Sequence, residues 1–482
     1  MNLLKTDKTT FTDEDILKYI EDYERDVVPV YTQMWEYYLG KNTKIMNRLA
    51  DDPNAPNNKV PVPYGRKLID TFKGYAYRPR YISYKQKDDV KGIDGYLKQL
   101  MKTFDLNEEH IKTSKAGRNT GIFGVAYEIL YIDKEFDAKM TVKAEPHFYP
   151  VDPREMILLY DYQAEPQKVA GIRFYKVSEE LYKVEVYYPG NITLYDRVKN
   201  SQSTKWELRE TSKSPNMFGE IPIVAYYFGD EMQGIIEPVI HLIDAYDALI
   251  TDAMDENEKF ANAFLVLKQV SITDPTKVKT PGTYSKALAN LKRFRVFENI
   301  AKDAEISYLT KDIPVDFFKY MTELIHDEIH IQSHIPDYAE RATGDLSGAA
   351  MDRLMFDFET LVSSAEADFD VGLYDRIRLI TTLYKKAGRV VGEPHDISIA
   401  HKRNKTTDVK GMADTALVMK NAGFSRYVIV DIMPDEVIPD VDAELKRQDE
   451  EREAMMPDID EAGEEEVAEE GNPIKKDEEE PA

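Results

Sequence analysis

Three long series of apolar residues at helical spacing constrain the fold of this chain more than any other feature of its sequence. Spacings of three and four residues place such side chains on one side of an α-helix. The first series predicts a helix over residues 237–262, roughly 40 Å long, and the second predicts a helix that begins near Pro314 and ends before Pro336. The third predicts a helix over residues 347–388, roughly 60 Å long, which carries Leu354, Phe358, Leu361, Val362, Ala365, Phe369, Leu373, Ile377, Ile380 and Tyr384.

The first two helices flank a compact and locally basic segment, residues 264–313. Its basic residues include Lys268, Lys277, Lys279, Lys286, Lys292, Arg293 and Arg295. A hairpin of helices about 40 Å long has too little surface of its own to bury two apolar faces. The pattern therefore favours packing against neighbouring copies of the chain. The alternative is an ordinary helical domain that buries both faces internally.

The rest of the chain mixes helices and strands. Thr12 and Asp15 form a capping-box pattern at the start of the first predicted helix. Pro189-Gly190-Asn191 is typical of a hairpin turn between two strands. Spacing and strand preference predict helices within 13–50, 64–75, 408–421 and 426–432, and strands within 122–228 and at 397–400. We therefore expect a mixed α+β, helix-dominated, multidomain fold.

Composition excludes several classes of protein. The 482 residues include 63 basic and 88 acidic side chains, a net charge of −25, and an apolar content of 42% that excludes global disorder. The absence of cysteine excludes disulfides, thiolate catalysis and cysteine zinc sites. Because phosphate neutralisation needs clustered basic residues, so acidic a chain is a poor candidate for tight static binding to DNA. Residues 451–482 carry 14 acidic and 3 basic side chains, which predicts a disordered tail.

Targeting signals are not evident in the sequence. The longest apolar stretches, such as residues 221–228, are far too short to span a bilayer. Lys5, Asp7 and Lys8 stand where a secretion signal would need apolar residues. We therefore expect a soluble, unexported protein.

Glycine-rich and acidic segments offer only weak indications of enzyme activity. Residues 117–124 contain three glycines but lack the Gly-Lys pair that binds nucleotide phosphates, so we expect a tight turn or strand entry there. Pro439 and Asp440, followed by Glu444 and Lys446, resemble the carboxylate–lysine cluster of a metal-dependent nuclease. Such a cluster arises easily by chance in an acidic region. We therefore expect no catalysis and no cofactor.

Three histidines, His326, His330 and His334, recur at four-residue spacing on the second predicted helix. Two of them could bind zinc in principle, but Asp327 follows the first histidine where the zinc-protease motif has glutamate. We therefore expect a solvated or intersubunit stripe, and no metal.

Four stretches of the chain, in order, resemble elements of a known family. They are the early segment Tyr37-Tyr38-Leu39-Gly40-Lys41-Asn42, residues 58–84 with their Gly-Tyr and Pro-x-x-Tyr endings, residues 221–224 leading into 242–247, and the Ser-Gly element at 344–350. Their order and spacing resemble those of tailed-bacteriophage portal proteins of the siphovirus type, the head–tail connector family. The resemblance covers most of residues 30–390.

The resemblance implies a ring of subunits, usually twelve, at one vertex of a phage capsid. Such a homododecamer forms the channel for double-stranded DNA packaging and ejection, docks terminase and then head–tail adaptor proteins, and contacts capsid and scaffolding proteins. The implied location is the virion, after assembly in the host cytoplasm and without contact with a membrane. Twelve helices at ~9–10 Å spacing would leave roughly 25–28 Å clear, enough for a duplex about 20 Å across.

The family's parts would map onto the chain in a defined order. They are the wing (1–236 and the long helix 349–388), the stem (237–263 and 314–334), the clip (264–313), the tunnel loop (335–348), the crown (389–448) and an acidic disordered tail (449–482).

The resemblance also implies which residues meet the partners. The clip would present Lys268, Lys277, Lys279, Lys286, Lys292, Arg293 and Arg295 to terminase and adaptors. The tunnel loop would face the DNA with Asp337, Glu340, Arg341, Gly344, Asp345, Ser347 and Gly348. Two alternatives remain, namely a virion or scaffold assembly protein without a channel and a metal-dependent nuclease.

Overall fold

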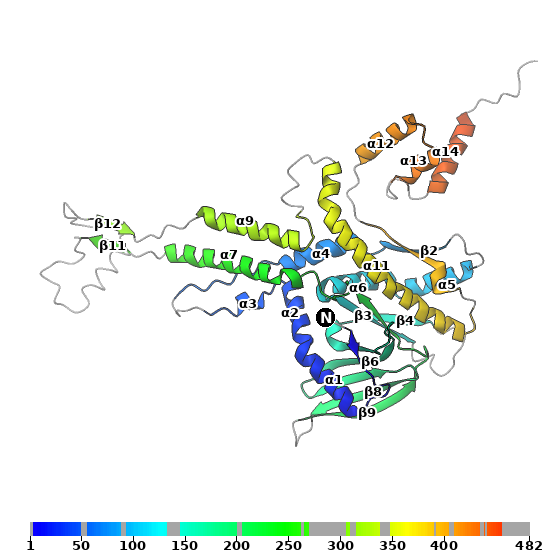
Figure 1. Ribbon diagram of the computed structural model, residues 1–482, viewed down its shortest axis with the longest axis horizontal. Helices are drawn as coiled ribbons and strands as arrows, with labels where there is room; N and C mark the ends of the chain where they lie inside the picture. The colour runs from blue at the N-terminus through cyan, green and yellow to red at the C-terminus, as the bar shows by residue number, and fades with distance from the viewer. Residues whose placement is uncertain are drawn as a thin grey trace, which may run out of the picture. The chain divides into compact units, whose positions relative to one another are not determined.

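The computed structural model describes residues 3–49, 55–87, 93–132, 145–199, 205–261, 265–268, 305–308, 315–337, 348–389, 392–403, 409–433, 438 and 441–455. These residues belong to two compact units, residues 1–404 and 405–482 (Figure 1).

The first unit contains most of the helices and all of the described strands. Its α-helices are α1 (Asp13–Asp26), α2 (Val28–Tyr38), α3 (Thr43–Met46), α4 (Tyr64–Ala76), α5 (Asp94–Leu106), α6 (Glu109–Phe123), α7 (Ile240–Ala261), α9 (Val315–Gln332) and α11 (Gly348–Lys386). The helices predicted at 237–262, 314–335 and 347–388 are confirmed within a few residues at each end. The capping box at Thr12 and Asp15 is also present.

The strands form four sheets. The largest has the order β1-β5-β6-β7-β8-β9, and the second has the order β10-β3-β4. Their bounds are β1 (Leu4–Lys5), β3 (Val125–Ile132), β4 (Pro146–Val151), β5 (Met156–Tyr160), β6 (Lys168–Ser178), β7 (Leu181–Tyr187), β8 (Asn191–Lys199), β9 (Trp206–Pro215) and β10 (Ile223–Tyr227). Two further pairs are β2 (Ile82–Gln86) with β13 (Ile397–His401), and β11 (Leu265–Lys268) with β12 (Glu305–Tyr308). The expected hairpin turn joins β7 to β8.

Helix α11 is the central packing element of the first unit (Figure 1). Its inner face is completely buried at Phe358, Phe369, Leu373 and Ile377. The ring of Phe369 stacks on Tyr226 of β10 with centroids 4.5 Å apart. This face repeats at three and four residues, so the sequence pattern and the packing agree. The described residues therefore form the helix-dominated α+β fold that the sequence predicts.

The glycine-rich segment at 117–124 is not the turn that we expected. It forms the second half of α6, and Gly124 ends the helix with a φ of +76°, directly before β3. Gly117 lies so close to Tyr77 that an added Cβ would be 2.3 Å from Cγ of that ring. Gly117 therefore allows close packing between α6 and Tyr77 at the C-terminal end of α4. Since residues 117–123 are helical, they do not form a phosphate-binding loop.

Replacing Gly117 by alanine should destabilise the protein by about 1–3 kcal/mol, because the Tyr77 ring must move away from the new methyl group. Gly74, in the last turn of helix α4 and partly exposed, is the matched control because nothing lies within 4 Å of an added Cβ. Gly74→Ala should be neutral or stabilising by up to about 1 kcal/mol. Chemical denaturation of both variants measures the difference, and equal midpoints would contradict the packing argument.

The second unit contains α12 (Val409–Asn421), α13 (Arg426–Asp431) and α14 (Val441–Met455). Two expectations need correction here. β13 belongs to the first unit through its pairing with β2, so the C-terminal unit begins at residue 405 rather than 389. Residues 449–455 are helical within α14, so the predicted disordered tail cannot begin at 449, and residues 456–482 lie outside the described residues.

No helix in the described part of the chain is both long and apolar enough to cross a membrane.

Candidate assembly surface and loop anchor

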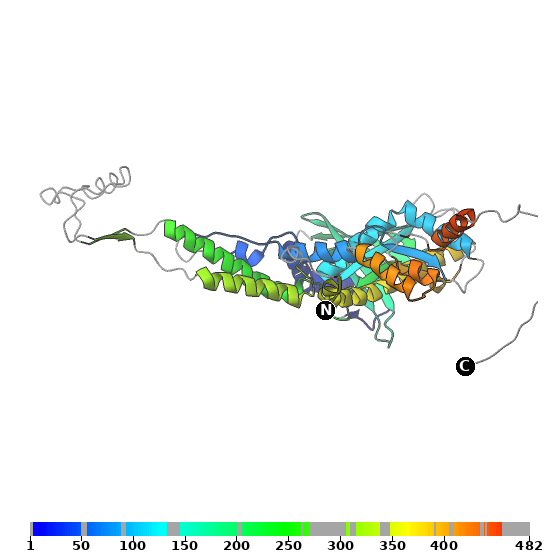
Figure 2. The ribbon, with the colours of Figure 1, turned by 90° about the horizontal axis from the view of Figure 1, so that it is seen from above.

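Helices α7 and α9 lie side by side as a pair (Figures 1 and 2). On α9, the side chains of Phe318, Met321 and Ile325 are half-buried, and Ile329 is buried. The predicted apolar series on α9 also includes Phe317 and Leu324, which are exposed on another face of the helix. The series is therefore divided between two faces.

The outer face of α9 carries a second apolar series with spacings of three, four and seven residues. Phe317, Tyr320, Leu324 and Ile331 are 55%, 61%, 40% and 60% exposed. We call these four residues the α9 stripe. Lys319 and Glu323, whose charged groups lie 3.8 Å apart, form an ion pair on the same helix. An exposed apolar series of this kind is typical of a protein–protein contact.

Acceptor side chains on α7 fasten the α7–α9 pair to the extended segment 58–62. Asp247, Thr251 and Asp255 accept hydrogen bonds from the backbone N–H groups of Val62, Val60 and Asn58, at 2.9, 3.3 and 2.7 Å. Alternate N–H groups of the extended segment 58–62 thus meet acceptors spaced four residues apart on one helix face. This ladder fastens the segment along α7.

A buried polar cluster continues the ladder toward α2. Asn42 donates to Asp247 at 2.7 Å and to Asp244 at 3.1 Å, and the Tyr37 hydroxyl donates to Asp244 at 2.5 Å. Burial raises the pKa of Asp247 to about 6. These carboxylates are used inside the subunit, so they cannot contribute to an exposed acidic wall. The sequence showed Asp244, Asp247 and Asp255 on one helix face, and this periodicity was the signal that could have identified the ladder.

Two of the three histidines form an anchor at the end of α9. Nε2 of His326 lies 2.8 Å from Oδ2 of Asp337, and Nδ1 of His326 lies 2.6 Å from the hydroxyl of Tyr64 on α4. Nδ1 of His330 donates to the carbonyl oxygen of Ile335 at 2.8 Å. Burial lowers the pKa of His330, which favours its neutral form. Lys67 of α4 completes the group through contacts with His330 and Asp337.

The prediction of a solvated or intersubunit stripe is therefore wrong for His326 and His330. Both are held by residues of the same chain, and His330 is buried. His334 does not share their face, because α9 ends at Gln332 and His334 has a φ of +56°. The spacing predicted the first two positions correctly but not their partners on α4.

Asp337 also differs from its predicted setting. It is 8% exposed, and its carboxylate contacts Lys67 and His326 of the same subunit. Gly348 is the first residue of α11. The other predicted tunnel-loop residues, Glu340, Arg341, Gly344, Asp345 and Ser347, lie outside the described residues.

The predicted clip is described only at its two ends. Lys268 is the last residue of β11 and pairs in register with Glu305 of β12. Both strands lie between α7 and α9 in the sequence. Lys277, Lys279, Lys286, Lys292, Arg293 and Arg295 lie outside the described residues.

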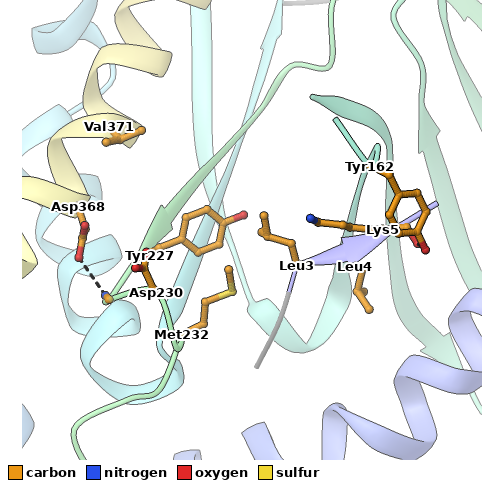
Figure 3. Close-up of a pocket in the computed structure, with 10 residues that line it drawn as sticks. Leu3, Leu4, Lys5, Tyr162, Tyr227, Asp230, Met232, Asp368 and Val371 are labelled. Carbon is orange, nitrogen blue, oxygen red and sulfur yellow. Dashed lines mark hydrogen bonds between the residues drawn. The ribbon is translucent and has the colours of Figure 1, made fainter. Parts of the chain in front are cut away.

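A hollow of about 750 Å³ lies between β1, the end of β10 and α11 (Figure 3). Leu3, Leu4, Met232 and Val371 give it an apolar lining, and Asp368 accepts the N–H of Gly229 at 3.0 Å. A second hollow of about 310 Å³ shares Gly229 and continues along α11 to Ser333 and His334. Neither hollow brings together a set of catalytic groups.

The nuclease alternative finds no support at Glu444. This residue lies on α14, where its carboxylate accepts hydrogen bonds from Arg447 and Gln448, which lower its pKa. Its expected partner Asp440 lies outside the described residues.

A comparison with protein families gives a match over most of the chain. The family described as phage portal protein, SPP1 Gp6-like, matches residues 17–458, which is nearly the whole chain. No curated protein matches the sequence. A solved structure described as the neck of an empty GTA particle computed with C6 symmetry is similar with 11% identity and a TM-score of 0.46, over 77% of this chain and 91% of that chain. The family match alone is sufficient for the assignment: the chain belongs to the SPP1 Gp6-like family of phage portal proteins.

Proposed function

We propose that this chain is the subunit of a portal ring, of about twelve copies, that forms the channel for double-stranded DNA at one vertex of a phage capsid. The observation that carries the ring is the α9 stripe, an apolar face left exposed on one helix of the α7–α9 pair. A closed ring uses the same heterologous contact at every interface. The α9 stripe supplies one side of such a contact.

The proposed parts follow the family's order. The α7–α9 pair is the stem, residues 264–313 are the clip that docks terminase and later the head–tail adaptors, and residues 338–348 are the DNA-facing loop. Residues 1–236 with α11 are the wing, and the C-terminal unit from residue 405 is the crown, near the capsid and scaffolding proteins. The subunit acts in the virion after assembly in the host cytoplasm, and the force for packaging comes from ATP hydrolysis in a partner.

The net charge of −25 suits a conduit, because a wall that repels phosphates does not hold a moving polyanion. Since Asp244, Asp247 and Asp255 are used inside the subunit, the repulsion must come from other acidic residues.

Native mass spectrometry with electron microscopy tests the ring directly. The expected result is an assembly whose mass is a whole multiple of 55.5 kDa, with an open centre wide enough for a DNA duplex. Single chains only, or rods, sheets and dimers without a central hole, would contradict the proposal.

Deleting residues 338–345 should leave rings intact but strongly impair DNA packaging, because the deletion removes the proposed DNA-contacting residues and keeps the Asp337 anchor. A packaging assay that measures DNA protected from nuclease gives the readout. Deleting residues 471–478 of the acidic tail removes the same number of residues and should leave packaging unchanged. Normal packaging by the loop deletion would refute the role of the loop.

A further inference from the structure

The anchor at the end of α9 brings three metal-binding side chains together. His326, His330 and Asp337 each offer one ligand atom, and these atoms lie within 4.8 Å of one another. Ligands around a tetrahedral zinc ion at ~2.0–2.1 Å are roughly 3.3 Å apart, so small side-chain movements would bring them into coordination geometry. The two histidines are four residues apart on one helix, and Asp337 follows five residues after the helix ends.

The outer nitrogen of each ring is already held by a partner outside this centre. Nδ1 of His330 donates to the Ile335 carbonyl oxygen at 2.8 Å, and Nδ1 of His326 lies 2.6 Å from the Tyr64 hydroxyl. Metal-binding histidines nearly always use their second nitrogen in this way, which fixes the ring orientation. Nε2 of both rings is therefore left on the side of Asp337 and Lys67.

A cation already contacts two of these three side chains. The Lys67 ammonium lies 2.9 Å from Oδ1 of Asp337 and 3.3 Å from Nε2 of His330. Nε2 of a neutral histidine accepts a hydrogen bond from this ammonium with the same lone pair that would bind a metal. The Lys67 side chain is 41% exposed, so it has a path into solvent when a stronger cation displaces it.

We propose that His326, His330 and Asp337 form a binding site for a divalent transition metal ion, with zinc the best match. Two imidazoles and one carboxylate select zinc and its neighbours over magnesium or calcium, which prefer oxygen ligands. A water molecule takes the fourth position. His326 then carries its proton on Nδ1, which donates a hydrogen bond to the hydroxyl oxygen of Tyr64. The ion links α9 to the first residues of the proposed tunnel loop.

The test uses the full-length protein after treatment with a chelator. Titration with Zn²⁺ in a calorimeter should show one saturable site per chain, and Co²⁺ should give the visible absorption bands of a tetrahedral complex. His330→Ala should weaken zinc binding at least about tenfold. His334→Ala is the matched control, because this exposed histidine lies outside the cluster and its loss should change nothing.

Lys67→Ala separates a metal site from a purely structural cluster. Removing the ammonium should strengthen zinc binding, since the ion no longer competes with a positive charge. A structural role alone predicts no zinc binding in either protein. Asp337→Asn, which keeps the shape of the side chain, should weaken binding without unfolding the chain. The proposal is overturned if wild type and Lys67→Ala both fail to bind zinc, or if His330→Ala binds as tightly as wild type. Ring formation does not enter these readouts, so the result is independent of the portal function.

Discussion

Replacing Tyr320 and Leu324 together by aspartate should leave a folded chain that no longer forms rings. The two residues are 61% and 40% exposed in the subunit, so the substitutions should change its folding stability by less than about 1 kcal/mol each. In the ring, however, each contact would bury two uncompensated carboxylates. This costs at least about 3 kcal/mol per contact, or over a hundredfold in affinity, and every interface of the ring carries the same defect.

Native mass spectrometry of the double variant should show mainly single chains at concentrations where wild type forms rings. Val177→Asp is the control, because Val177 is 55% exposed on β6 and lies outside the α9 stripe. It should assemble normally. Intact rings from the double variant would show that the α9 stripe faces solvent in the assembly, and another surface would then have to hold the subunits together.

Local periodicity predicted α11 because this helix buries one continuous apolar face against its neighbours. In α11, Phe358, Phe369 and Leu373 repeat at helical spacing and are fully buried, so pattern and packing carry the same information. The second half of α6 gave no such signal. Gly117 fits there because Tyr77 lies too close for a side chain. The two residues are 40 positions apart in the sequence, so local periodicity does not reveal their contact.

The polar contacts of the stem were less accessible to sequence reasoning. Asp247 and Asp255 bind backbone N–H groups of Val62 and Asn58, and a backbone donor leaves no complementary side chain in the sequence. Likewise, the spacing of His326 and His330 predicted a shared helix face but could not identify Tyr64 and Lys67, which come from α4.

The second large effect is expected at Arg376, whose side chain on α11 is completely buried. Its guanidinium donates to both carboxylate oxygens of Glu128 at 2.7 and 2.9 Å, and to Glu109 and Thr113 at 3.0 Å each. It thereby joins α11 to α6 and β3. Burial raises the pKa of Glu128, and the guanidinium opposes that rise. Without the arginine, two buried carboxylates would face each other with no cation between them.

Arg376→Ala should therefore cost about 3–5 kcal/mol, a large part of the stability of a typical domain. Arg378→Ala is the matched control, because Arg378 is 46% exposed and its ion pairs with Glu220 and Asp375 should be worth about 1 kcal/mol or less. Both tryptophans, Trp35 and Trp206, lie in the first unit, so their fluorescence follows its unfolding in denaturant.

The cost of Arg376→Ala should also depend on pH in a definite direction. With the guanidinium removed, burial keeps the pKa of Glu128 in the folded chain above its value in the unfolded chain. When folding raises the pKa of a carboxyl group, ionisation of that group destabilises the folded state. This loss of stability is absent at a pH below the pKa in the unfolded chain, and it grows as the pH rises toward the pKa in the folded chain. The gap in stability between variant and wild type should therefore narrow from neutral pH toward about pH 4–5. If the gap is instead constant with pH and no larger than that of Arg378→Ala, Arg376 acts only by filling space, and the ion network does not hold α11 to the sheet.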